Sequence, residues 1–160
     1  MTAQIAEKLL YRGEMLSLCS TPLGPYRATT QHSLKLVSPH TALWRGYVGT
    51  WSIEDGRLYL IDIVGHAPGS TTVGLKDFFP HATDGVFAHW FTGDLRCPVG
   101  GLLKYRHMGF GSLYEKDLFI RVSRGVVQED HTVVNGTAPI ADTGGFRVGA
   151  ATFLGDGSKS

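Results

Sequence analysis

Three side chains of different chemistry, Arg45, Tyr47 and Asp62, are brought onto one face of a predicted β-hairpin. The hairpin spans residues 42–63, where two β-rich runs meet at an Asp-Gly turn, a strong local signal for this structure. Counting from the turn puts Gly49 opposite Asp62, which leaves a gap between the three polar groups. A guanidinium, a phenol and a carboxylate around a gap can orient a small polar ligand. The alternative is an Arg–Asp pair, bridged by the tyrosine, at the end of a strand pair.

A second group of polar residues surrounds the glycine-rich stretch HMGFGS. It consists of Arg96, Lys104, Tyr105, Arg106, His107, Tyr114 and Glu115. His107 with Glu115 would make a base and its orienting carboxylate, and Arg96 or Arg106 would hold an anionic group. The glycines lack the Lys-Ser/Thr ending of a phosphate loop and the strand-to-helix context of a dinucleotide site. Turn formation is therefore the favoured interpretation of this stretch, and no cofactor is predicted.

The histidines and cysteines indicate no metal site. The seven histidines are scattered without the spacing that metal ligands need. Cys19 and Cys97 are too few for a disulfide scaffold and have no CxxC partner, so we expect free thiols in a reducing compartment. A single bridge between them is the alternative. Ser17 and Cys97 lack the flanking motif of a nucleophile and are interpreted as structural.

Composition and charge limit the classes of partner. The chain has 160 residues, 42% of them hydrophobic, which is typical of one globular domain. Its formal net charge of +1 predicts neither nucleic acid nor an anionic membrane as a partner. The apolar runs are too short for a transmembrane helix. Glu7 and Lys8 interrupt the apolar stretch that a secretory signal would need, so the expected location is the cytoplasm.

The strands that must position these residues are short and separated by glycine-rich turns. Besides the first hairpin they are residues 8–11, 14–20, 34–37, 94–97, 102–108 and 113–115, and a second hairpin of 117–122 with 126–129. A helix over 5–10 is a competing interpretation. One helical turn within 73–80 and an amphipathic helix over 84–91 are predicted, whereas 21–26 and 64–72 are expected to lack regular structure.

These elements predict a mainly β class (β-rich α+β): an antiparallel barrel, roll or small sandwich of six to eight strands with one or two short helices. We expect residues 1–131 to form this single domain. From residue 132 the composition shifts to Gly, Ala, Thr, Ser and Asp. Residues 132–160 are therefore predicted to be a mobile tail, with an edge strand or a partner contact as the alternative.

Three segments together resemble a family of small uncharacterised bacterial proteins. These segments are WRGYVGTWSIEDGRLYLIDI, VFAHWFTGDLRCPVGG and KYRHMGFGSLYEKDLFI. The resemblance covers roughly residues 9–127 and leaves out the tail. It implies a bacterial and cytoplasmic origin, and it implies no activity.

Two functions from different classes follow from these residues. The first is a non-enzymatic module that binds a small polar or anionic molecule, or a protein, through a polar-aromatic pocket on the hairpin face. The second is a small hydrolase or transferase that uses His107 as acid/base with Glu115 or Asp62 and an arginine for an anionic substrate. A structural or oligomeric role through exposed strand edges is a third possibility.

Overall fold

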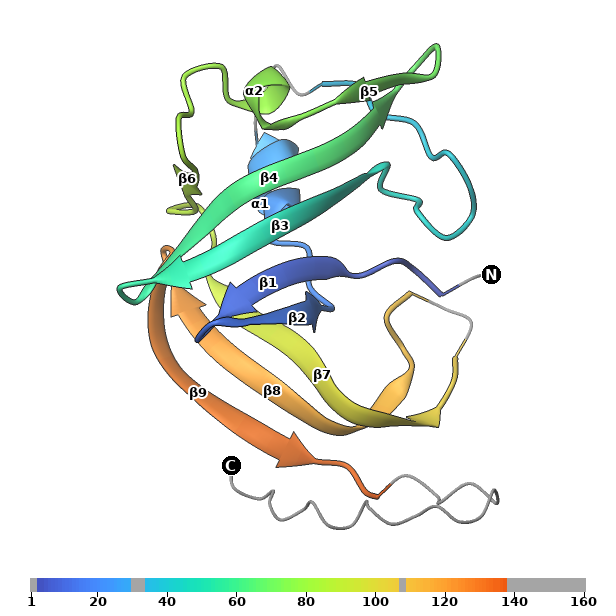
Figure 1. The fold of residues 1–160 in the computed structure, drawn as a ribbon, viewed down its shortest axis with the longest axis vertical. Coiled ribbons are helices and arrows are strands. Elements are labelled where there is room, and N and C mark those ends of the chain that lie inside the picture. Colours follow the sequence, from blue (N-terminus) through green and yellow to red (C-terminus); the bar gives the residue numbers. More distant parts are fainter. Residues whose placement is uncertain (1–2, 30–33, 107–108, 138–160) are drawn as a thin grey trace.

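The chain folds into one curved sheet of nine strands with two short helices beside it (Figure 1). These counts refer to residues 3–29, 34–106 and 109–137, which the computed structural model describes. The elements are β1 (Glu7–Tyr11), β2 (Glu14–Leu18), α1 (Leu23–Thr29), β3 (Tyr47–Glu54), β4 (Arg57–Ala67), β5 (Thr71–Val73), α2 (Leu75–Phe78), β6 (Val86–Phe87), β7 (Gly93–Lys104), β8 (Leu113–Ser123) and β9 (Val126–Val134). The predicted mainly β class with short helices is confirmed.

Three hairpins of the sheet close through two-residue turns in which both residues have positive φ. The turn between β3 and β4 has φ 53° at Asp55 and 74° at Gly56. Arg12-Gly13 joins β1 to β2, and Arg124-Gly125 joins β8 to β9, with the same pair of signs. This backbone matches the twist of the strands that it connects, and glycine at the second position adopts it without steric cost. The predicted hairpins are therefore confirmed at their turns.

The strand order is β2-β1-β3-β4-β9-β8-β7, with β5 and β6 paired to β4. Neighbouring strands are antiparallel except for β1 and β3, which run parallel. A parallel pair needs a crossover, and the segment with α1 that leads from β2 back to β3 supplies it. This pair is an exception to the predicted antiparallel arrangement.

The sheet bends over at β4 and β9, which share only the register pair Arg57 with Val126. At its other side the ends of the sheet approach each other, because the Cys19 N–H donates to the Arg96 carbonyl at 2.8 Å. Strand pairing does not continue across this contact, so the sheet does not close into a barrel (Figure 1). The bent sheet encloses a core in which Trp51, Leu60 and other side chains are fully buried; they include Leu9, Leu18, Leu58, Leu95 and Ile120.

The register of the first hairpin follows the prediction from the turn as far as Trp51 and then changes. Trp51 lies opposite Leu60 as predicted, but a bulge follows, so that Thr50 lies opposite Asp62 and Gly49 opposite Ile63. One extra residue in a strand moves every later side chain to the other face. Asp62 is therefore exposed instead of facing Gly49, and the predicted pairing of these two residues is wrong.

Other local predictions have mixed outcomes. The helical turn within 73–80 is confirmed as α2, and the helix over 5–10 is replaced by β1. Residues 84–91 form no helix; Val86 and Phe87 pair with β4 as strand β6 instead. Helix α1 begins within 21–26, where we expected no regular structure, because proline is tolerated in a first turn whose N–H groups have no intrahelical partner.

The remaining differences are extensions of strands. β4 continues to Ala67 and pairs with β5, where a loop over 64–72 was predicted. β7 continues through Pro98 to Lys104, as an edge strand permits, because no strand of the described part of the chain pairs with its outer side there. Residues 34–37 form no strand. β9 extends to Val134, beyond the predicted end of the domain at 131, and residues 138–160 lie outside the described part of the chain.

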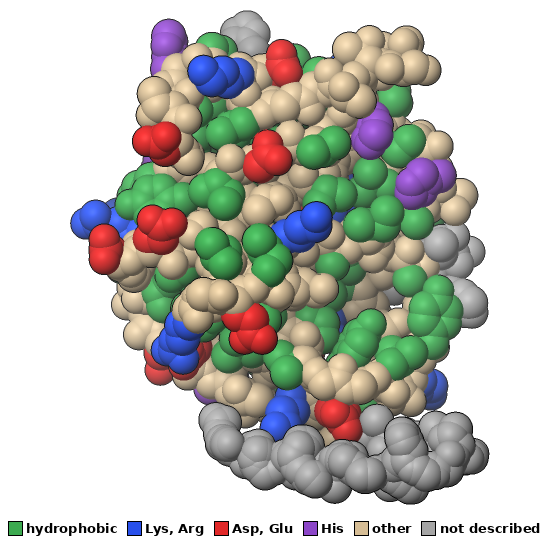
Figure 2. All heavy atoms as spheres, viewed as in Figure 1, with side chains coloured by type: hydrophobic (Ala, Val, Ile, Leu, Met, Phe, Trp, Pro, Cys, Tyr) green, Lys and Arg blue, Asp and Glu red, His purple; other side chains and the backbone are tan. Residues whose placement is uncertain are grey.

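Charged side chains of both signs are interspersed on the face shown in Figure 2. This distribution agrees with the net charge of +1 and gives that face no single-sign field to attract a polyanion. Within the described residues, no helix is long and apolar enough to cross a membrane.

Candidate functional site

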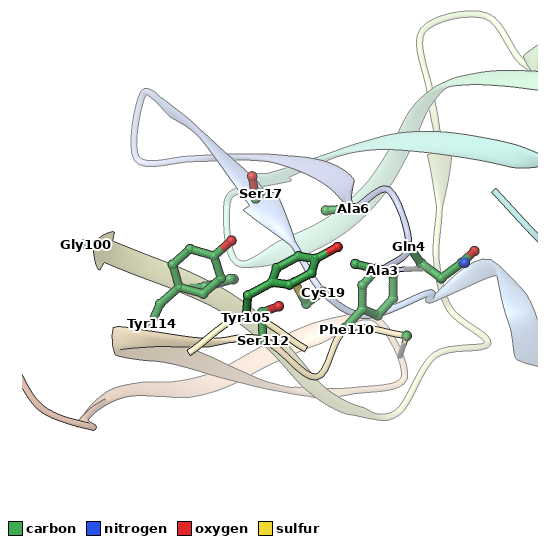
Figure 3. Close-up of a pocket in the computed structure, with 12 residues that line it drawn as sticks. Ala3, Gln4, Ala6, Ser17, Cys19, Gly100, Tyr105, Phe110, Ser112 and Tyr114 are labelled. Atoms are coloured by element: carbon green, nitrogen blue, oxygen red, sulfur yellow. The ribbon is translucent and has the colours of Figure 1, made fainter. Parts of the chain in front are cut away.

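A cavity of about 400 Å³ lies between the N-terminal segment, the end of β2, the outer half of β7 and the loop from β7 to β8 (Figure 3). Its volume is within the range of small-molecule sites. The residues that line it are Ala3, Gln4, Ala6, Ser17, Cys19, Pro98, Gly100, Tyr105, Gly109, Phe110, Ser112 and Tyr114. None of these described lining residues carries a formal charge.

One wall of the cavity is aromatic and the opposite wall carries small side chains. Figure 3 shows the rings of Tyr114, Tyr105 and Phe110 following one another along one side, with Ser17 and Ala6 across from them. The hydroxyl ends of the two tyrosines point across the cavity (Figure 3). In the described part of the chain, neither the Tyr114 hydroxyl nor the Ser17 hydroxyl has a hydrogen-bond partner. Both groups can therefore donate to and accept from a ligand.

The aromatic wall is held by the guanidinium of Arg96. Its Nη1 donates to the Phe110 carbonyl at 2.8 Å and its Nη2 to the Ser112 carbonyl at 3.1 Å. Its Nε donates to Asp117 Oδ1 at 2.8 Å, and Asn135 donates to the other carboxylate oxygen at 2.9 Å. A planar guanidinium can make these contacts simultaneously because its donors form a rigid fork. Arg96 therefore positions the loop, and its donors are used within the protein.

The N-terminal segment binds the same loop from the other side. The Gln4 N–H donates to the Gly109 carbonyl at 2.9 Å, next to a parallel bridge between Ala3 and Gly109. The Gln4 side chain in turn accepts from the Trp44 N–H at 2.8 Å and donates to the Thr41 carbonyl at 2.8 Å. Both ends of its amide are thus used to fix the segment that forms this side of the cavity.

Next to the cavity, a buried carboxylate anchors β1 to β3. Glu7 is 0% exposed, and its Oε2 accepts from Arg45 Nε at 3.0 Å, Arg45 Nη2 at 2.8 Å and the Gly49 N–H at 2.9 Å. Its Oε1 accepts from the Trp51 indole N–H at 2.9 Å. Four donors satisfy both oxygens, which a buried carboxylate requires. Arg45 also lies over the Phe110 ring, 5.8 Å from its centre, and so links this anchor to the cavity wall.

The Glu7 carboxylate and the Trp51 indole leave no room for a side chain at position 49. A Cβ at Gly49 would lie 2.6 Å from Glu7 Oε1 and 2.9 Å from Trp51 Nε1, closer than real Cβ contacts. The missing side chain therefore makes the room in which the carboxylate meets its donors. The gap that the sequence predicted at Gly49 exists, but the protein's own Glu7 fills it.

Burial governs the proton affinities near the site. Burial raises the pKa of Glu7 above its ordinary value, while Arg45, Trp51 and the Gly49 N–H act in the opposite direction. Burial also raises the pKa of Tyr47 and of the Cys19 thiol, and Arg96 and Arg45 partly oppose the effect at Cys19. The Cys97 thiol, fully buried, has its pKa raised to about 12. Neither thiol is activated as a nucleophile, and both cysteines are free.

The structure keeps Arg45 and Tyr47 of the predicted hairpin trio in contact but separates Asp62 from them. Arg45 pairs with Glu7, Tyr47 is 3% exposed in the core with the Arg45 guanidinium 5.4 Å from its ring centre, and Asp62 is exposed on the opposite face. The trio therefore forms no pocket of its own.

Part of the second predicted group lies at the cavity or supports its walls. Tyr105 and Tyr114 line the cavity, and Arg96 holds its loop. Glu115 accepts a hydrogen bond from the Gly101 N–H at 2.9 Å. His107 lies outside the described residues. Among those that are described, no group of histidine, cysteine and carboxylate side chains could hold a metal ion.

Sequence reasoning missed Glu7 and the side of the cavity formed by Ser17 and Cys19. A signal for Glu7 exists, because it alternates with Leu9 and Tyr11 on the inward face of β1, where an acidic residue must find donors. Ser17 and Cys19 carry no such signal. They meet the loop from β7 to β8 only because the two ends of the sheet approach each other.

Comparison with protein-family models, with curated proteins and with solved structures finds no match to the chain. The resemblance to a bacterial family therefore stays a prediction, and the function must be argued from the site alone.

Proposed function

We propose that the protein is a non-enzymatic binding module that holds a small, uncharged polar molecule in the cavity beside the loop from β7 to β8. The observation that supports this most directly is the lining of the cavity. It combines three aromatic rings with the hydroxyls of Tyr114 and Ser17, which have no partner among the described residues, and the described lining residues carry no charged side chain. Ligand sites are commonly mostly apolar with a few polar groups that fix orientation.

The charges around the cavity favour an uncharged ligand over an anionic one. Two guanidiniums beside the cavity are engaged, Arg45 by Glu7 and Arg96 by Asp117 and two loop carbonyls. An anion in the cavity would lose its hydration without gaining a free cation among the described lining residues. The proposed site is consequently this cavity and not the face of the first hairpin.

The hydrolase or transferase alternative has no specific observation in its favour. Its acid/base, His107, lies outside the described residues, and Glu115 is used to hold the Gly101 N–H. We therefore propose binding alone. A cytoplasmic location is part of the same proposal, supported by two cysteines that remain free thiols, as in a reducing compartment. The bacterial origin rests on the resemblance alone.

A thermal-shift screen tests the proposal with the whole chain. The panel contains neutral sugars and nucleosides together with charged amino acids and phosphate esters. A ligand at about 100 times its Kd stabilises the native state by roughly 2.7 kcal/mol, a visible shift for a protein of this size. We expect hits among the uncharged compounds. Hits confined to charged compounds, or none from the whole panel, would contradict the proposal.

Two further measurements locate a hit. Tyr114→Phe removes a hydroxyl from the cavity, and Tyr59→Phe, the matched control, removes one from β4 outside it. Loss of one hydrogen bond should raise Kd about 3- to 10-fold in the first variant and leave it unchanged in the second. A bound ligand should also slow alkylation of Cys19, which lines the cavity. Equal effects of both substitutions, or unprotected Cys19, would place the ligand elsewhere.

A further inference from the structure

We infer that the ligand of this cavity is a neutral sugar, bound as a mono- or disaccharide. This inference rests on the proposed function and adds the chemical class of the ligand. It is carried by the order of groups along the cavity, in which a row of rings faces small and hydroxyl-bearing side chains (Figure 3).

The aromatic wall fits the apolar face of a sugar ring. A pyranose presents several C–H groups on one face and hydroxyls around its rim. The face of an aromatic ring is electron-rich and attracts such C–H groups, and the contact also removes apolar surface from water. Tyr105, Tyr114 and Phe110 offer rings one after another, so that more than one sugar unit would find a platform.

The polar groups of the cavity match hydroxyls better than charged groups. The hydroxyls of Tyr114 and Ser17 each donate and accept, as the hydroxyls of a sugar do, so either partner can orient its hydrogen to suit the other. A carboxylate or phosphate, in contrast, only accepts when ionised and would need cations. Arg45 and Arg96, which contact the cavity wall, are held by Glu7 and Asp117.

The main competing class of neutral ligand is a nucleoside or a similar planar heterocycle. Recognition of a base edge depends on fixed donors and acceptors, typically amides, carboxylates or guanidiniums. The amide that lines the cavity belongs to Gln4, and both of its ends bind the chain's own backbone, at Thr41 and Trp44. The described lining residues can therefore stack on a base, but they offer few fixed donors and acceptors for hydrogen bonds to its edge.

The test is binding of neutral mono- and disaccharides, with adenosine and uridine as the competing class, measured by calorimetry on the whole chain. Protection of Cys19 from alkylation confirms the location. We expect sugars to bind and to protect Cys19, with Tyr114→Phe raising Kd about 3- to 10-fold through the lost hydroxyl. Tyr114→Leu, which also removes the ring, should raise it further, and Tyr59→Phe should not change it.

The outcomes separate the two proposals. Nucleosides that bind and protect Cys19 when sugars do not would overturn the sugar inference and leave the binding module standing. Absence of any neutral ligand that protects Cys19 would overturn both. Ser17→Ala provides a second variant, because the Ser17 side chain is exposed and its substitution should leave folding intact. Unchanged sugar affinity in both Ser17→Ala and Tyr114→Phe would also refute the inference.

Discussion

Replacing Glu7 with glutamine should lower the free energy of unfolding by about 2 to 4 kcal/mol. The carboxylate is 0% exposed and accepts four hydrogen bonds, two from Arg45 and one each from Gly49 and Trp51. Glutamine keeps the volume and one acceptor oxygen. Its amide N–H groups, however, would face either the Trp51 indole N–H or the Arg45 guanidinium, so that a buried donor loses its acceptor.

The magnitude follows from two contributions. Leaving a buried donor unsatisfied costs about 1 to 3 kcal/mol. Breaking a buried ion pair by removing one partner costs about 3 to 5 kcal/mol, of which glutamine recovers a part because its oxygen still accepts from Arg45. Arg45 is itself mostly buried, with 14% of its side chain exposed, so water replaces little of the lost interaction.

Denaturant unfolding followed by tryptophan fluorescence measures this change, since Trp51 is a direct partner of Glu7. The matched control is Glu14→Gln, an exposed glutamate on the neighbouring strand, which should change the free energy of unfolding by less than about 0.5 kcal/mol. A Glu7→Gln effect as small as that of the control would refute the assignment of Glu7 as the anchor of β1 on β3.

Glu7 should also make the free energy of unfolding depend on pH. Burial raises the pKa of Glu7 from its ordinary 4.5 when the chain folds. When folding raises the pKa of a carboxyl group, the protonated group stabilises the folded state. This stabilisation is complete at pH values below the ordinary pKa and is lost as the pH rises through the pKa of the folded state. Arg45→Met removes the nearest opposing charge, so its stability should fall more steeply with rising pH above 4.5 than that of the wild type. Parallel pH profiles of the free energy of unfolding would contradict this.

Three further predictions concern other contacts. Gly49→Ala should destabilise by at least about 1 to 3 kcal/mol in denaturant unfolding, because its Cβ would displace the Glu7 carboxylate; a neutral effect would show that this carboxylate can move. Arg96→Lys should cost about 1 to 3 kcal/mol, since one ammonium cannot replace three directed guanidinium contacts, and full stability of this variant would argue against the clamp. The pKa of Tyr11 is raised to about 12 by burial and by its hydrogen bond to Asp130, so stability should fall as pH rises from 10 toward 12. Tyr11→Phe should flatten that fall, and an unchanged slope would refute it.

The turn chemistry could be predicted from the sequence because it is local. Asp-Gly and the other two glycine turns adopt positive φ, which glycine permits without steric cost, and they set the register of the residues nearest to them. The pairing of Trp51 with Leu60 therefore follows from sequence. The alternation of buried and exposed residues also indicated a mainly β domain, which the structure confirms.

Only the tertiary structure decided what lies around those turns. The bulge beyond Trp51 moved Asp62 out of the predicted site and brought Ile63 into the core. Glu7 reached Arg45 because β1 pairs with β3 in parallel, a contact between segments about forty residues apart that local patterns do not specify.

The cavity also depends on the tertiary structure. Its walls come from the N-terminal segment, β2, β7 and the loop that follows, and its aromatic side stays in place because Arg96 reaches across to two loop carbonyls. Sequence determined which residues could supply rings and hydroxyls, and Tyr105 and Tyr114 were found in that way. Tyr105 and Tyr114 lie across the cavity from Ser17 only because the two ends of the sheet approach each other. Side chains that are distant along the chain are brought together by the packing of the whole domain.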